Sequence, residues 1–197
     1  MVPRPYGTVW GMARLKADDW AEAALTAIRE GGGLAAVTVE PLAVRLGATK
    51  GSFYWHFTNR EALIEAALAR WEEQETEAVI LLVNKEDDPR ARVRRIMELT
   101  FRAAVERPDP IEQVLLADAA HPLVAAALHR VSERRLAYLV ELFTDLGHSE
   151  EEACHRALLA YTSYLGHAQL AHSAPRVLPE GPGAERYLET VLAGLLR

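Results

Sequence analysis

The stretch "LGATKGSFYWHF", residues 46–57, decides how this chain is interpreted. Helical spacing of apolar residues precedes it, and Gly47 interrupts that spacing. Thr49 then offers an N-cap for a new helix, on which Phe53 and Phe57 lie one turn apart and share a face. The stretch therefore predicts two short helices joined by a tight glycine turn, which is the helix-turn-helix arrangement.

The second helix of such a pair enters the major groove of DNA, so its outward side chains matter. Lys50 can donate to guanine, Ser52 can bond a base edge or a phosphate, and Gly51 lets the helix backbone come close. Further donors and flat apolar area come from Tyr54, Trp55 and His56. Folding alone does not require these residues on an outer face, and the pattern predicts a DNA contact.

The longer segment "TVEPLAVRLGATKGSFYWHFTNREAL", residues 38–63, resembles the DNA-binding segment of the tetracycline-repressor (TetR) family of bacterial transcriptional regulators. The similarity extends from about residue 20 to residue 68. Its most specific part is the pattern G-x-x-x-G-x-x-Y-x-H-F, formed by Gly47, Gly51, Tyr54, His56 and Phe57.

The resemblance implies a role for each position of the second helix. Bases would be approached by Thr49, Lys50, Gly51 and Ser52. Phosphates would be held by Tyr54 and His56, with Trp55 at the edge of the groove and Arg60 on a further phosphate. The chain departs from many relatives at Glu40 and Pro41, where they carry basic or polar residues. We therefore expect the first turn of the preceding helix to contact the DNA backbone only through Thr38. Arg45 would partly compensate for the missing contacts.

Composition predicts an all-α protein, because Ala, Leu, Arg and Glu dominate and β-branched residues are sparse. A first helix is expected from residue 18 or 19 to the glycines at 31–33. Helical periodicity then continues over 60–84, 89–107, 110–120, 122–147, 150–173 and 184–197. We expect an irregular arm (1–16), a three-helix helix-turn-helix DNA-binding domain (17–60), and a helical ligand-binding and dimerisation domain (61–197).

Charge is unevenly distributed along the chain. Residues 1–71 carry a net charge of +1 and residues 72–197 carry −7, which together give the formal −6. This balance argues against a general nucleic-acid coat protein, and it places any DNA contact near the N-terminus. The single Cys154 excludes an internal disulfide, and no run of roughly 18 uncharged apolar residues occurs. We therefore expect a cytoplasmic protein without a membrane partner.

For the C-terminal half, the resemblance implies a homodimer, with a double-stranded operator DNA and an unidentified small molecule as partners. Small or apolar residues at helical spacing make a candidate dimer interface of Ala153, Ala157, Ala160, Leu188, Val191, Leu192 and Leu195. Residues that combine apolar bulk with a polar tip, or lie among them, make a candidate pocket of Trp71, Phe101, Leu115, His121, Tyr138, Tyr161, Tyr164 and His167. The whole predicts a ligand-responsive regulator, most simply a repressor released from a near-palindromic operator.

Two other functions compete with this interpretation. Six of the seven histidines follow residue 120, but their spacing matches no paired metal-binding motif, so we expect no metal, no cofactor and no catalysis. A helical interaction protein without sequence-specific DNA binding is the stronger alternative. The acidic run "EEQETE", residues 72–77, is expected to be solvated helix surface.

Overall fold

The computed structural model describes residues 15–106 and 111–197, which form helices and turns without a strand. The N-terminal elements are α1 (Ala17–Gly31), the 3-10 turn η1 (Leu34–Ala36), α2 (Val39–Arg45), α3 (Lys50–Tyr54) and α4 (Arg60–Glu72). A π-helical turn, η2 (Glu73–Glu77), joins α4 to α5 (Ala78–Val83). The remaining elements are α6 (Pro89–Glu106), α7 (Ile111–Ala117), α8 (Pro122–Asp145), α9 (Glu150–Ser173), the 3-10 turn η3 (Pro175–Val177) and α10 (Pro182–Leu195).

The predicted all-α fold is confirmed, and the predicted helices agree with these elements to within a few residues, except that the single helix expected over 60–84 is divided into α4, η2 and α5. The expected arm falls mainly on residues 1–14, which lie outside the described residues. No described helix has the length and apolar character that crossing a membrane requires.

The glycines after α1 end that helix and allow a close approach. Gly32 has a φ of 72°, the left-handed conformation that favours glycine. Gly33 lies against Asp118, which follows α7, and a Cβ atom on Gly33 would be 2.6 Å from the Asp118 Oδ2 atom. The same oxygen accepts a hydrogen bond from the Leu34 backbone N–H at 2.6 Å. The turn after α1 is thus tied to a segment that lies far along the chain.

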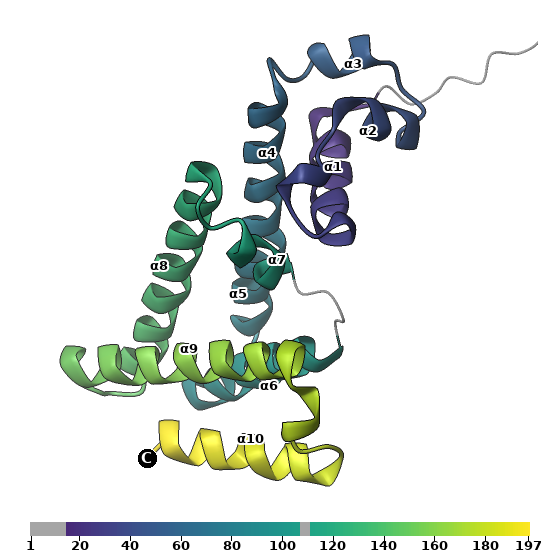
Figure 1. Ribbon diagram of the computed structural model, residues 1–197. Coiled ribbons are helices and arrows are strands. Elements are labelled where there is room, and N and C mark those ends of the chain that lie inside the picture. The colour runs from purple at the N-terminus through teal and green to yellow at the C-terminus, as the bar shows by residue number, and fades with distance from the viewer. Residues whose placement is uncertain (1–14, 107–110) are drawn as a thin grey trace, which may run out of the picture.

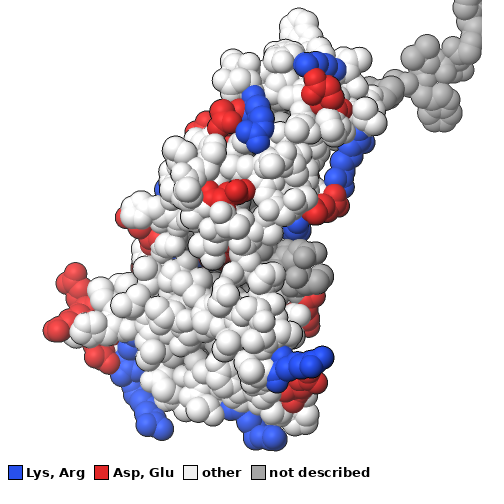
Figure 2. All heavy atoms as spheres, viewed as in Figure 1, with Lys and Arg blue, Asp and Glu red and all other residues white. Residues whose placement is uncertain are grey.

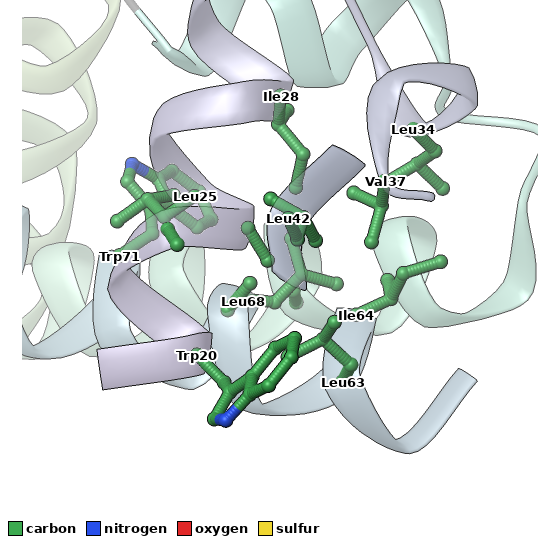
Figure 3. Close-up of a cluster of buried hydrophobic side chains, with 14 of the residues drawn as sticks. Trp20, Leu25, Ile28, Leu34, Val37, Leu42, Leu63, Ile64, Leu68 and Trp71 are labelled. Atoms are coloured by element: carbon green, nitrogen blue, oxygen red, sulfur yellow. The ribbon is translucent and has the colours of Figure 1, made fainter. Parts of the chain in front are cut away.

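A first hydrophobic core holds α1 to α4 (Figure 3). Trp20 and Leu25 from α1 meet Leu63 and Leu68 from α4, and none is more than 2% exposed. The same core extends to α7 and the start of α8 through further buried apolar side chains. The α4 helix, which begins where we expected the domain boundary, therefore packs against both halves of the chain.

A second core joins α5, α6, α8, α9 and α10. In Figure 1, α10 lies at the end of the molecule opposite to α3. Five residues of the expected dimer interface are buried in this core at 1% exposure or less, namely Ala153, Ala157, Ala160, Leu192 and Leu195. That part of the prediction is wrong, because these side chains pack inside their own subunit. Leu188 and Val191 are half-buried against the same core.

Candidate functional site

The turn between α2 and α3 is fixed by local backbone geometry. Gly47 has a φ of 62°, and the Ala48 N–H donates to the Ala43 carbonyl at 2.8 Å. Thr49 caps α3, because its side-chain oxygen accepts a hydrogen bond from the Ser52 N–H at 3.2 Å. We call α2, α3 and this turn the reading head.

Two phenylalanines anchor the reading head to the first core. Phe53 is fully buried and its ring meets the Trp20 ring edge-on, with centroids 5.5 Å apart. Phe57 stacks on Phe53 at 5.7 Å. On the other side of α3, Tyr54 is 57% exposed and Trp55 is 83% exposed. The amphipathic sequence of α3 thus leaves two aromatic side chains in solvent.

The two cations of the reading head are paired with carboxylates. The Lys50 ammonium donates a hydrogen bond to Glu40 across the turn. Arg45 makes a two-pronged contact with Glu30 of α1, at 2.7 and 3.2 Å. The hydrogen bond from Lys50 lowers the pKa of Glu40, and the same bond raises the pKa of Lys50. Both groups therefore stay charged around neutral pH, and the pair is exposed.

The other expected DNA contacts fall into two groups. Thr38, Thr49 and Gly51 are exposed, and Ser52 and His56 are half-buried at the same end of the molecule. Arg60 instead points its guanidinium at the backbone before α2. Its Nε atom donates to the Val37 carbonyl at 2.8 Å, Nη2 donates to the Leu34 carbonyl, and Nη1 pairs with Glu61 at 3.1 Å. These contacts give Arg60 a structural role at the start of α4.

Charges balance in this part of the chain. Residues 15–60 contain five Lys and Arg side chains and five Asp and Glu side chains, for a formal net charge of zero. Figure 2 shows basic and acidic side chains next to one another at the end where α2 and α3 lie, without a continuous basic area on that face. A DNA contact here would therefore depend on shape and hydrogen bonds more than on a strong positive field.

A cavity of about 370 Å³ opens between the two cores. Its walls come from α4, η2 and α5 on one side and from α6, α7, α8 and α9 on the other. This volume lies at the lower end of the range found for small-molecule sites, and the lining is mainly apolar. Four expected pocket residues line it, namely Trp71, Tyr138, Tyr161 and Tyr164.

The other four expected pocket residues do not line the cavity. Leu115 is fully buried in the first core, and the His121 Nε2 atom lies 3.3 Å from the Glu61 carboxylate at the start of α4. Phe101 and His167 stack on each other with centroids 4.3 Å apart. The His167 Nε2 atom is 3.2 Å from the Phe101 carbonyl oxygen, and burial lowers the pKa of the His167 imidazole. These residues connect helices and form no part of the cavity wall.

The cavity also contains a buried ion pair that the sequence analysis missed. Arg135 of α8 donates through Nη1 to Glu112 of α7 at 2.8 Å, and the Tyr164 hydroxyl donates to the same carboxylate oxygen at 3.1 Å. Burial lowers the pKa of Arg135, but the Glu112 carboxylate, Tyr164 and Tyr161 together outweigh burial and the net shift is upward. Burial raises the pKa of the Tyr164 hydroxyl, so that group remains a proton donor at neutral pH.

Arginines of α8 bind the acidic segment at the end of α4, which we expected to be solvated. Arg130 pairs with Glu72, and Arg134 pairs with Glu77 at 2.9 Å. Arg135 donates through Nε to the Thr76 hydroxyl at 3.0 Å and through Nη2 to the Glu75 carbonyl at 3.4 Å. Arg135 therefore contacts the π-helical turn and the cavity at once. The expectation for the run 72–77 was wrong, because several of its side chains have partners on α8.

Comparisons with known proteins agree with this geometry. Residues 22–67 match the model of the bacterial regulatory proteins of the tetR family. A transcriptional regulator from a Rhodococcus species shares 24% identity and a TM-score of 0.66, with 92% of this chain and 94% of that chain covered. A TetR-family transcriptional regulator from Streptomyces coelicolor shares 18% identity and a TM-score of 0.63, with 92% and 89% covered. A search of curated proteins finds no match to this sequence.

Proposed function

Because the chain belongs to the tetR family of bacterial regulatory proteins, we propose that it is a homodimeric transcriptional repressor that a small molecule releases from its operator. The observation that carries the proposal is that two buried phenylalanines anchor α3 of the reading head, so that its other side faces outward. The proposal assigns the chain no catalytic role, and it places its action in the cytoplasm, where bacterial operators are.

The exposed side chains of α3 support sequence-specific DNA binding. Lys50 is suited to the edge of a base, Tyr54 and the half-buried His56 to phosphate oxygens, and Trp55 to the sugar edge. The described residues leave Trp55 83% exposed at the C-cap of α3, so its position there needs an explanation other than packing against them. Arg60 is left out of this contact set, because its guanidinium already holds the turn before α2.

A second face of α9 supports dimerisation by a symmetric pair of chains. Leu158 and Leu159 are each 52% exposed, and Leu170 is 40% exposed, so α9 presents leucines to solvent on the side away from its buried alanines. We place the dimer contact on these leucines. Because α3 lies at the far end of the molecule, contact through this face leaves both reading heads free. A two-fold dimer of this kind reads a near-palindromic operator.

The cavity supports a response to a ligand. It lies beside Trp71, at the end of the same helix that begins next to the reading head. A ligand that binds only one arrangement of this helix changes the free energy of DNA binding by roughly 1 to 3 kcal/mol, which is a five- to 150-fold change in the affinity for DNA.

The proposal is tested by selecting fragments of bacterial genomic DNA on the purified protein and measuring gel shifts with the selected site. In Lys50→Ala, the preference for the selected site over sites altered at one or two base pairs should fall by about five- to 150-fold. The affinity of this variant for random DNA should change little. Tyr54→Phe should weaken binding to all sites to a similar degree. Lys85→Ala, an exposed lysine between α5 and α6, is the matched control and should change neither.

Two outcomes would contradict the proposal. Equal losses on the selected site and on random DNA for Lys50→Ala would remove its assigned role. Failure of the unmodified protein to retain any DNA selectively at moderate salt would favour a helical interaction protein instead.

A further inference from the structure

The ion pair in the cavity restricts which ligands can bind there. The Glu112 and Arg135 side chains are 12% and 14% exposed, and they meet at 2.8 Å. Removing one partner of a buried pair leaves an uncompensated charge, which is strongly destabilising. A ligand that takes either Glu112 or Arg135 for itself incurs that cost.

The remaining charges around the cavity do not favour either sign. Apart from that pair, the described lining contains two arginines and two glutamates, so their formal charges cancel. At the ion pair itself, an anionic ligand would have to compete with Glu112 for Arg135, and a cationic ligand would have to compete with Arg135 for Glu112. An uncharged ligand leaves the pair intact and gains from the apolar wall.

Among the described residues, one buried polar atom of a cavity-lining side chain has no hydrogen-bond partner. The indole Nε1 atom of Trp71 is buried and makes no hydrogen bond, although Trp71 lines the cavity. An indole N–H is a donor only, and a buried donor is stabilised by an acceptor. A ligand oxygen that reaches this N–H would accept its hydrogen bond and leave the ion pair intact.

We infer that the cavity binds an uncharged, mainly apolar effector that carries a hydrogen-bond-accepting oxygen, and that the pair of Glu112 and Arg135 discriminates against both anions and cations. The inference deepens the proposed function, because it names the chemical class of the molecule that would release the regulator. It rests on that proposal only for the consequence of binding, since binding itself is measured without DNA.

The test uses three probes with one ring system and different charge: 1-naphthalenemethanol, 1-naphthoate and 1-naphthylmethylammonium. Binding to the unmodified protein is measured by isothermal titration calorimetry. The alcohol should bind at least about tenfold more tightly than either ion, which corresponds to about 1.4 kcal/mol. Equal binding of an ion and the alcohol, or no binding of the alcohol at about 1 mM, would overturn the inference.

Two single variants should invert the preference in opposite directions. Glu112→Gln leaves Arg135 without its carboxylate, so naphthoate should become the tightest probe. Arg135→Met leaves Glu112 without its cation, so the ammonium probe should become the tightest. An unchanged order of affinities in a folded variant would contradict the assigned discrimination.

A double variant covers the case in which a single variant does not fold. Glu112→Gln combined with Arg135→Met removes both charges and creates no unpaired ion, so it should fold and still bind the alcohol. Without the pair, the difference in affinity between the alcohol and the two ions should become smaller than in the unmodified protein, and an unchanged difference would contradict the discrimination assigned to the pair. Trp71→Phe, which keeps an aromatic ring but removes the donor, should weaken the alcohol about two- to tenfold, and unchanged affinity would remove the acceptor from the proposal.

The failure of this inference can be told apart from the failure of the proposed function. If the protein binds DNA selectively but prefers a charged probe, only the effector class is wrong. If the alcohol binds as expected and no DNA is retained, the cavity keeps its assigned chemistry while the regulatory role is lost.

Discussion

Glutamine in place of Glu40 should make DNA binding stronger at low salt and more sensitive to salt. In the free protein Glu40 accepts a hydrogen bond from Lys50, and the pair is exposed on the reading head. When α3 meets DNA, the Glu40 carboxylate stays near the phosphates and opposes the attraction that Lys50 supplies. The substitution keeps the shape of the side chain and removes this opposing charge.

The size of the effect follows from the charge balance of the reading head and the residues around it. Residues 15–60 carry five cations and five anions, so Glu40→Gln raises the formal charge from zero to +1. A dimer on its operator gains two such charges. Each effective phosphate contact changes the slope of log K against log salt by about −0.9, so the variant dimer should be steeper by up to about 1.8.

The assay is fluorescence anisotropy of the labelled operator, titrated with protein at several KCl concentrations. Glu185→Gln on the exposed start of α10 is the matched control, because it makes the same change in total charge at the far end of the molecule. Identical slopes for the two variants would refute the reasoning, because they would show that Glu40 does not lie near the phosphates.

Three further results are expected. Phe53→Ala should lower the free energy of unfolding in urea by about 3 to 5 kcal/mol, since it empties a fully buried site under α3, and a loss below about 1 kcal/mol would show that the ring is no anchor. Leu159→Glu should convert the dimer to a monomer in light scattering, while Leu116→Glu on the exposed side of α7 should not; equal masses would move the interface elsewhere. Because burial lowers the pKa of His167 below its usual value of 6.5, the unfolded chain binds a proton more readily than the folded chain, and stability should fall as the pH drops below about 6.5. His167→Phe should reduce that fall and His172→Phe, on an exposed site, should not; parallel curves for both would contradict the assignment.

The fold was predictable where local signals are strong. Gly47 and Thr49 act within a few residues of themselves, through backbone conformation and capping, and they place the turn and the start of α3. The long helix expected over 60–84 is interrupted by the π-helical turn at η2. No residue in that turn is a glycine or a proline, and the arginines of α8 that bind it are distant in sequence.

Features of the candidate sites that depend on neighbouring residues could be predicted from the sequence. Features that depend on contacts between distant residues could not. The outward residues of α3 follow from helical spacing alone. The contacts of Arg60 do not, because they involve carbonyls that lie 23 and 26 residues earlier in the chain. The pair of Glu112 and Arg135 likewise joins two helices, and neither residue stands in a pattern that distinguishes it from a surface charge.

The α9 helix shows why one apolar stripe could not be assigned to a dimer. Its small residues, such as Ala153 and Ala157, do permit close helix contact, but the helices that approach them are α6 and α8 of the same chain. A turned face of the same helix carries Leu158 and Leu159, which no described part of the subunit covers to the same degree. Helical spacing indicates that α9 has two apolar faces. It does not indicate which face packs inside the subunit, because that depends on which other helices approach each face. Alanines allow the closest backbone approach and are used within the subunit, which leaves the bulkier leucines exposed for the contact between subunits that we propose.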